Sequence, residues 1–402
     1  MTTNQPSINI THSPSPAQLE RIFYILDKVF IVGGDYFRDR LLQDTAYQPE
    51  TTWYATVDEN IASSIQIFPL KLRVGNTVLK VGGIGSVGTD PNYRGMGLAQ
   101  SILNAQCEWM IKNEYDLGLL FAVIHPYYEK LGWKLIPESA YMIERPSYQA
   151  PSSLYKIIPF SIEYIDQLQA IYEQYNQSRT CTVVRNASYW HDLIKWPEWK
   201  KTDCLLLHDG AKIVAYGLIE KSSTDRAILY ELNYLPEAEH EVISLFTALC
   251  NLRSGCTHIQ AKLTRDHKLY SYVQSIAATE VPINYTMWKM LNIDSLIGKL
   301  RSEFEARLLA SLFHDDRMNI VLQIGDRNFY LNYSNKTLIL SHEEIEQPAH
   351  ETYYLSFTPE YFICNIINGY KNDEIDTNTL AESLRAILFP LQHSIFYTTD
   401  KI

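Results

Sequence analysis

The sequence has few cysteines and no apolar run long enough to cross a membrane. Its six cysteines are scattered and none forms a Cys-x-x-Cys pair, which favours core thiols in a reducing compartment. No stretch approaches the roughly 18 uninterrupted apolar residues of a membrane span. The first ten residues, MTTNQPSINI, lack the basic and apolar regions of a signal peptide. We therefore expect a soluble cytoplasmic protein that does not enter the membrane.

Positive charge is also scarce. The chain has 35 Lys and Arg against 46 Asp and Glu, a net charge of −11. Nucleic-acid binding needs basic surface that displaces counterions, so this balance argues against it. The same balance is compatible with a cationic small-molecule substrate. No metal is expected either, because the acidic clusters beside His314 and His342 lack metal-ligand spacing.

Two common nucleotide-binding motifs are missing. The segment GTDPNYRGMGLAQ, residues 88–100, has Gln100 where a dinucleotide fold requires the third glycine of Gly-x-Gly-x-x-Gly. A P-loop is absent as well. What is present is a glycine pair at the junction of a strand and a helix, where free backbone N–H groups and the helix dipole favour an anion. A phosphate site and a purely structural turn are both consistent with this pattern.

The patterns along the chain predict a mixed α/β (α+β) protein in three segments. Apolar spacing predicts a helix over 15–30, and β-branched runs between residues 52 and 90 predict antiparallel strands. A linker is expected at 145–154, followed by a second α+β segment with a hairpin turn at Asp209-Gly210. A third segment begins near Ile293 with a helix around 302–313, then three strands, and a helix capped by Thr358. The predicted domains are 1–147, 148–292 and 293–402.

The glycine turn and a later motif resemble the GNAT superfamily of acyl-CoA N-acyltransferases over residues 15–145. Arg94, Gly97 and Ala99 match its Arg-x-x-Gly-x-Ala motif, and PYYEKLGW at 126–133 is similar to a second family motif. The resemblance implies acetyl-CoA as cosubstrate and Tyr128 as the general acid, with Tyr127 fitting less well. It also implies a cofactor-binding set on the backbone: Ser86 and Val87 for the pantetheine arm, and Arg94, Gly95, Met96, Gly97, Leu98 and Ala99 for the pyrophosphate.

The order and length of the three segments resemble the enhanced intracellular survival (Eis) family of N-acetyltransferases. This implies a second, degenerate GNAT-like domain without a pyrophosphate motif, a sterol-carrier-like third domain, and a hexamer. It further implies that the carboxylate of the last residue, Ile402, reaches the active site as a base. Isoleucine departs from the aromatic residue usual there. A carboxylate with a pKa near 3.5 is a weak base for an ammonium, so attraction of the cation or transfer through a water are alternatives.

The acceptor is expected beside the first helix and its loop, where carboxylates and aromatic rings suit a cationic amine. The candidate residues are Asp27, Phe30, Tyr36 and Phe37. Packing or capping within the first domain explains each of them equally well. The leading hypothesis is acetyl transfer to an aminoglycoside-like or polyamine-like amine. The alternatives are a protein or peptide lysine acetyltransferase and a non-catalytic carrier that uses an apolar tunnel in the third domain.

Overall fold

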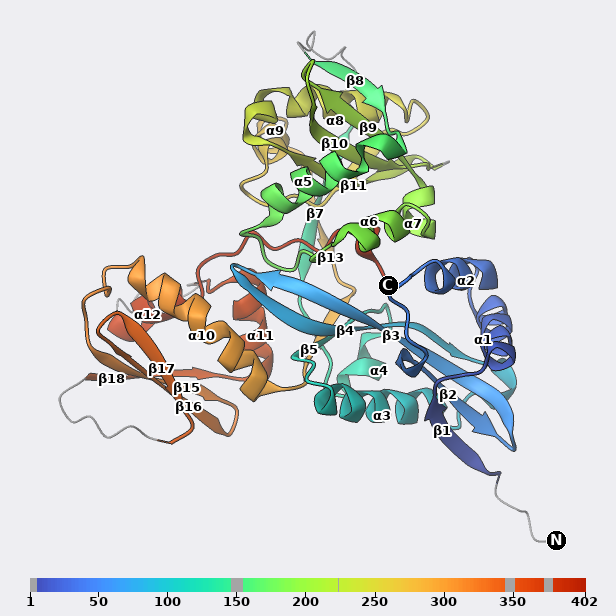
Figure 1. The fold of residues 1–402 in the computed structure, drawn as a ribbon, viewed down its shortest axis with the longest axis horizontal. Helices are drawn as coiled ribbons and strands as arrows, with labels where there is room; N and C mark the ends of the chain where they lie inside the picture. The colour runs from blue at the N-terminus through green and yellow to red at the C-terminus, as the bar shows by residue number, and fades with distance from the viewer. Residues whose placement is uncertain (1–5, 146–154, 223, 344–350, 372–378) are drawn as a thin grey trace.

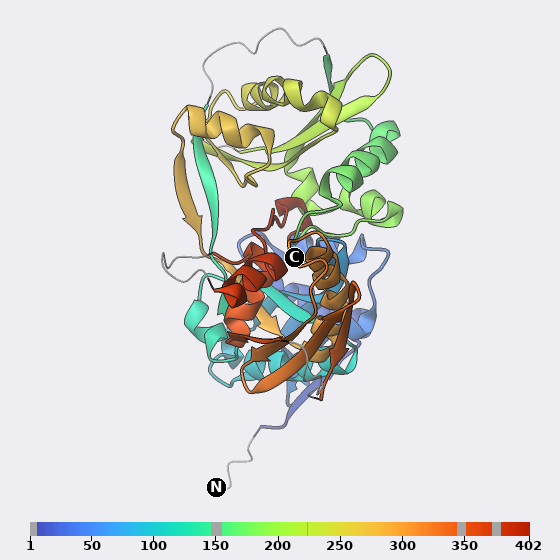
Figure 2. The ribbon, with the colours of Figure 1, turned by 90° about the vertical axis from the view of Figure 1, so that its left-hand side faces the viewer.

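The structure, a computed structural model, describes residues 6–145, 155–222, 224–343, 351–371 and 379–402. Three lobes meet around the C-terminus, which lies near the centre of the molecule (Figures 1 and 2). Two of the lobes are built on seven-stranded sheets and the third on a four-stranded sheet. The expected linker at 145–154 lies outside the described residues except for Arg145.

The first sheet has the strand order β1-β2-β3-β4-β5-β14-β6. Its neighbours are antiparallel except for β4 and β5, which run parallel. The strands are β1 (Ile8–His12), β2 (Thr52–Val57), β3 (Asn60–Val74), β4 (Thr77–Thr89), β5 (Leu117–Phe121), β14 (Thr286–Met290) and β6 (Lys134–Leu135). The helices of this lobe are α1 (Pro16–Val29), α2 (Gly34–Leu42), α3 (Leu98–Lys112) and α4 (His125–Glu129).

Local sequence explains most of this lobe. Ser15 and Gln18 form a capping box at the start of α1, and Pro16 stands at its first position. The turns at Asp58-Glu59 and Gly75 adopt positive φ and reverse the chain between β2, β3 and β4. The antiparallel strands, α1 and α3 are therefore confirmed, whereas β1 was not predicted.

The second sheet repeats the topology of the first, in the order β8-β9-β10-β11-β12-β7-β13. Again a single neighbouring pair, β11 and β12, runs parallel. The strands are β8 (Lys156–Pro159), β9 (Thr202–His208), β10 (Ile213–Glu220), β11 (Arg226–Tyr234), β12 (His258–Ala261), β7 (Glu138–Glu144) and β13 (Thr279–Ile283). Its helices are α5 (Ile165–Asn176), α6 (Ala187–Leu193), α7 (Pro197–Lys200), α8 (Val242–Asn251) and α9 (Lys268–Ser275).

The two large sheets exchange strands through a shared two-stranded ribbon. Its first strand is β6 followed by β7, and its second is β13 followed by β14. β14 pairs with β5 and β6 in the first sheet, while β7 pairs with β12 and β13 in the second. The predicted boundary at residues 147/148 therefore does not separate the sheets. By sequence position β7 falls in the first predicted domain and β14 in the second. Each of them pairs with strands on the other side of the boundary.

The third lobe packs helices on a four-stranded sheet of order β17-β16-β15-β18. The strands are β15 (Met318–Ile324), β16 (Arg327–Ser334), β17 (Thr337–Ser341) and β18 (Glu351–Phe357), and the helices are α10 (Ile293–Leu309), α11 (Pro359–Asn368) and α12 (Leu380–Leu388). Thr358 caps α11, as expected. The helix expected around 302–313 instead begins at Ile293 with Asn292 as its cap. Gly298 inside the helix interrupts its apolar pattern.

Four clusters of buried residues form the core. Two of them lie on opposite faces of the first sheet, one under α3 and the other under α1 and α2. Another cluster joins the third lobe to the first sheet, and it contains phenylalanine rings with centroids 5.3 to 5.6 Å apart, at positions 304, 357, 362 and 389. Among the described helices, none has both the length and the apolar composition that a membrane crossing requires.

Candidate active site

The first sheet opens at the carboxyl end of β4. The parallel pairing of β4 with β5 ends at Ile84 and Leu120, although β4 continues to Thr89. Beyond that point the described residues give β4 no partner on its β5 side. Backbone N–H and C=O groups on such an edge are open to an extended amide-bearing ligand.

A bulge re-aims the backbone at this opening. Ser64 pairs with Gly88 and Gln66 with Gly85, so Ser86 and Val87 together oppose a single residue of β3. Ser86 has a φ of 51°, in the left-handed region. Bulges of this kind turn backbone groups away from the ladder and are frequent beside active sites. Ser86 and Val87, the two residues expected to contact the pantetheine arm, are therefore the two that the bulge takes out of regular pairing with β3.

The start of α3 offers free backbone donors. Gly97 is the N-cap with a φ of 74°, and no side chain in the described structure caps the helix. Gly95 also has a positive φ of 83°, and a Cβ on either glycine would meet open space. The first-turn N–H groups of a helix have no intrahelical partner, so this exposed turn can accept an anion. Arg94 is exposed at its edge.

An acidic residue precedes this turn, but its charge is compensated. Asp90 is almost fully buried and caps the short turn at 91–93 by accepting a hydrogen bond from the N–H of Asn92 at 3.1 Å. Arg21 and Lys28 from α1 lie 3.4 and 3.7 Å from its carboxylate. These cations offset the negative charge next to the proposed pyrophosphate site and tie α1 to the end of β4.

Replacing Gly97 with alanine tests the anion site. We expect the KM for acetyl-CoA to rise about 5- to 30-fold, because an alanine in the left-handed region costs roughly 1–2 kcal/mol and disturbs the donor geometry. Steady-state kinetics measure this. Gly298→Ala is a matched control, since a Cβ there also meets open space but the residue lies inside α10. Equal KM values for the two variants would contradict the site.

Tyr128 lies on α4, just after the end of β5. The motif around it is explained by packing: Gly132 adopts a φ of 81°, and the fully buried Trp133 then packs over β5. A Cβ on Gly118 of β5 would come within 2.6 Å of the Trp133 ring. The backbone N–H of Trp133 donates to the carbonyl of Tyr128 at 3.1 Å. Glycine and tryptophan therefore fix α4 at the open end of the sheet.

Burial keeps the Tyr128 hydroxyl protonated. Desolvation, followed by the neighbouring Tyr127, raises the pKa of Tyr128 to about 12. Burial also raises the pKa of Tyr127, whose ring packs edge-on at 5.0 Å. A neutral phenol at neutral pH can donate a proton to a departing thiolate.

The chain terminus lies against β4 beside the bulge. A Cβ on Gly85 would come within 3.0 Å of the carboxyl carbon of Ile402 and 2.9 Å of the Phe68 ring. A Cβ on Gly83 would come within 2.5 Å of Cδ1 of the Ile402 side chain. The terminal carboxylate therefore lies directly over β4 at Gly85, the residue before Ser86. Glycines allow this close approach because they have no side chain. The residue pattern alone does not predict this approach, although two glycines inside a strand signal a close contact.

The predicted acceptor residues are not all free for a ligand. Asp27 accepts the N–H of Gly34 at 2.9 Å, at the start of α2, and Tyr36 donates to Glu198 at 2.6 Å. Phe30 and Phe37 pack together, with ring centroids 4.9 Å apart. Phe37 also lines a narrow cavity that extends from α1 to Ser86. Asp27 and Tyr36 thus already make hydrogen bonds within the protein, to Gly34 and Glu198.

A larger cavity of about 260 Å³ lies between the second sheet and the end of β5. Phe121 at the end of β5 lies 5.5 Å from Phe396 and 6.1 Å from Tyr285, measured between ring centroids, and all three line the cavity. Glu198 and Lys201, an ion pair at 3.2 Å, and Lys401 line it as well. Lys401 precedes the terminal residue, whose carboxyl carbon lies against Gly85 of β4.

Comparison with known proteins agrees with this geometry. Residues 12–136 match the family model of the acetyltransferase (GNAT) domain. No curated protein matches the chain. Similar solved structures include a probable N-acyltransferase from Enterococcus faecalis (TM-score 0.69, 13% identity, 90% of each chain) and a GCN5-related N-acetyltransferase from Anabaena variabilis (0.66, 16%, 89% of each). Eis1 from Mycobacterium abscessus is also similar (0.63, 15%, 98% of this chain and 100% of that one).

At these identities the likeness to solved structures concerns the fold, and it extends over nearly the whole chain. The repeated sheet topology agrees with tandem GNAT-type units followed by an additional α+β domain. In the described residues no group of three or more His, Cys, Asp or Glu is arranged to hold a metal ion. Residues 12–136 are therefore a GNAT acetyltransferase domain, and the chain is an acetyl-transferring enzyme.

Proposed function

We propose that the enzyme transfers an acetyl group from acetyl-CoA to an amine of a small cationic acceptor, such as an aminoglycoside-like or polyamine-like molecule. The observation that carries this proposal is the terminal carboxylate of Ile402 on the open strand β4, next to Ser86. Pantetheine would pair with Ser86 and Val87, and the pyrophosphate would bind at residues 94–99. The sterol-carrier-like nature of the third lobe and the hexamer stay predictions.

The proposed reaction is a direct transfer. The amine nitrogen attacks the thioester carbonyl carbon, and the C–S bond breaks as the new C–N bond forms. The thiolate takes a proton from the Tyr128 hydroxyl, and the proton lost from the ammonium goes to the Ile402 carboxylate or to a water beside it. The neutral state of Tyr128 supports the first role. A carboxylate also attracts the cationic acceptor to the site.

The setting of the terminus favours a small acceptor over a folded protein. Besides the region next to α1, a second candidate site for the acceptor is the cavity of about 260 Å³, whose lining includes Tyr285, Phe396 and Lys401. Aromatic faces suit a cationic amine, and the charges of Lys201 and Glu198 compensate each other.

Acetyl-CoA turnover tests the proposal. Thiol release would be followed with aminoglycosides, polyamines and lysine peptides as acceptors. We expect release with the first two classes at kcat/KM values at least about tenfold above those for peptides, a difference of about 1.4 kcal/mol. A preference for peptides would favour the lysine acetyltransferase. No release with any amine, together with no binding of acetyl-CoA, would favour the carrier.

A further inference from the structure

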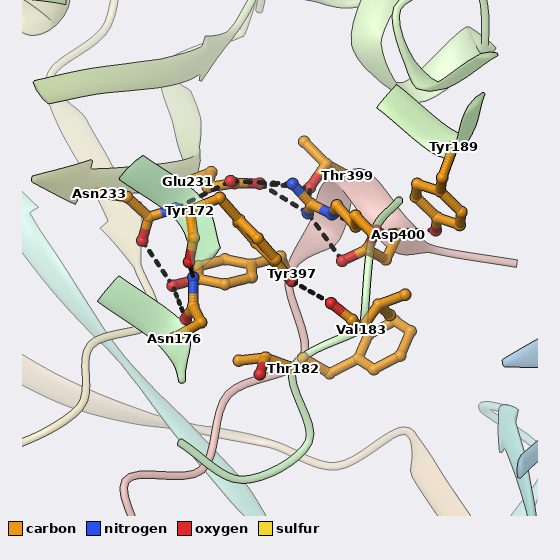
Figure 3. A network of polar contacts seen from close by, with 12 residues as sticks. Tyr172, Asn176, Thr182, Val183, Tyr189, Glu231, Asn233, Tyr397, Thr399 and Asp400 are labelled. Carbon is orange, nitrogen blue, oxygen red and sulfur yellow. Dashed lines mark hydrogen bonds and ion pairs between the residues drawn. The ribbon is translucent and has the colours of Figure 1, made fainter. Parts of the chain in front are cut away.

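A fully buried cluster of three charges connects the chain end to the second lobe (Figure 3). Arg185 lies before α6, Glu231 lies on β11, and Asp400 lies two residues before the terminus. The three side chains are 0%, 0% and 1% exposed. The guanidinium donates to Asp400 through Nε at 2.9 Å and Nη2 at 2.8 Å, and to Glu231 through Nη1 at 3.1 Å and Nη2 at 2.9 Å.

Neutral groups complete the hydrogen bonding of both carboxylates. Tyr189 donates to Asp400 at 2.8 Å, and Thr399 donates to Glu231 at 2.6 Å. Asn233 donates to Glu231 at 2.9 Å, and its carbonyl oxygen accepts from Tyr397 at 2.8 Å. Each residue at 397, 399 and 400 is thus bonded to the second lobe. A buried polar network with satisfied members fixes a single geometry.

The cluster limits where the terminus can go. Only Lys401 separates Asp400 from Ile402, and two residues span at most about 7 Å. On the other side of this short link, the carboxyl carbon of Ile402 lies against Gly85 of β4. The second lobe therefore holds residues 397–400, which we call the tail. The tail in turn places the terminal carboxylate against the first lobe.

Holding the tail does not by itself require charges. Ile395, Phe396 and Tyr397 are already buried among apolar neighbours. Replacing a buried ion-pair cluster with apolar residues is often neutral or stabilising, because the charges must be desolvated. The bidentate contacts of Arg185 add a defined orientation, because a planar guanidinium fixes how both carboxylates are turned.

We propose that Arg185, Glu231 and Asp400 are positioning residues for acetyl transfer, which orient the terminal carboxylate beside the opening of β4. This inference rests on the proposed role of that carboxylate. The second lobe, which carries no pyrophosphate motif, would then act as the part of the active site that sets the position of the base.

Asp400→Asn is the informative variant. It removes the charge that anchors the tail but keeps its shape, and Arg185 retains its bidentate partner Glu231, so no buried charge is left alone. We expect kcat to fall about tenfold or more, since a misplacement of about 1 Å can cost up to 10²-fold, with the KM for acetyl-CoA within twofold of the original. Asp203→Asn, which breaks an ion pair with Arg253 in the same lobe, should leave both unchanged.

A double-mutant cycle separates this inference from the proposed function. A variant with one glycine appended after Ile402 would be combined with Asp400→Asn, and we expect the double variant to be no slower than the extended chain alone. Additive losses, or a kcat for Asp400→Asn within twofold of the original while the extension is harmful, would overturn the positioning role. A harmless extension would instead overturn the proposed role of the carboxylate.

A readout without catalysis completes the test. Carboxypeptidase release of Ile402, followed by mass spectrometry, should be at least about tenfold faster in Asp400→Asn than in the original chain or in Asp203→Asn, because the tail opens more often. Equal rates would contradict the inference. If Asp400→Asn does not fold, Tyr189→Phe removes one donor from the same carboxylate and should show a smaller loss of kcat and a smaller rise in release.

Discussion

Replacing Tyr128 with phenylalanine should lower kcat by roughly 10²- to 10⁴-fold, the range that a general acid contributes. The ring stays and only the hydroxyl is lost, so its packing against the first-lobe core is kept. Acetyl-CoA binding should change little. The measurement is steady-state thiol release, with binding of acetyl-CoA measured separately.

Tyr127→Phe is the matched control, because the two rings are neighbours and burial raises the pKa of both. It should lose less than about threefold. The pH profile offers a second check: with a pKa of about 12, Tyr128 is protonated at every pH below about 11, so it should cause no alkaline loss of activity in the usual range. A large loss in Tyr127→Phe and none in Tyr128→Phe would reverse the assignment.

Appending a single glycine after Ile402 should lower kcat by about 10²-fold. The new carboxylate is displaced by up to about 3.8 Å, and a neutral amide takes the place of the charge beside Gly85. The rest of the tail keeps its contacts with the second lobe. The KM for acetyl-CoA should stay within about twofold, since the pyrophosphate turn is untouched.

Ile402→Leu is the control for the extension. It keeps the carboxylate at its position and nearly conserves the side-chain volume, so we expect less than about a threefold change in kcat. An extended chain that works as well as this control would place the base elsewhere. A loss in both variants would mean that the side chain, which lies over Gly83, matters more than the charge.

The sequence was sufficient where a feature is local. The helix over 15–30, the glycine turn before α3 and the motif that ends at Gly132-Trp133 each depend on a few neighbouring residues, so the sequence pattern predicts them directly. The fold class and the GNAT domain were predicted on this basis and are confirmed. The roles of Ser86, Val87 and residues 94–99 remain predictions, although the bulge and the free helix start agree with them.

The rest depends on contacts between distant segments. Nothing near residue 140 shows that β7 leaves the first sheet, because its partners are β12 and β13. Arg185, Glu231 and Asp400 are ordinary charged residues until the fold buries them together. Tyr36 was a candidate for the acceptor, but its hydroxyl is bonded to Glu198, which is 162 residues away along the chain.

The shared ribbon also sets the order in which this enzyme can be made. Strand β5 leaves the ribosome early, yet β14, its neighbour in the sheet, follows only at residues 286–290. At a synthesis rate of about 5–20 residues per second, the catalytic sheet waits on the order of ten to thirty seconds for its missing strand. A nascent chain therefore has every motif residue of the acetyltransferase domain before β14 is available to complete the first sheet.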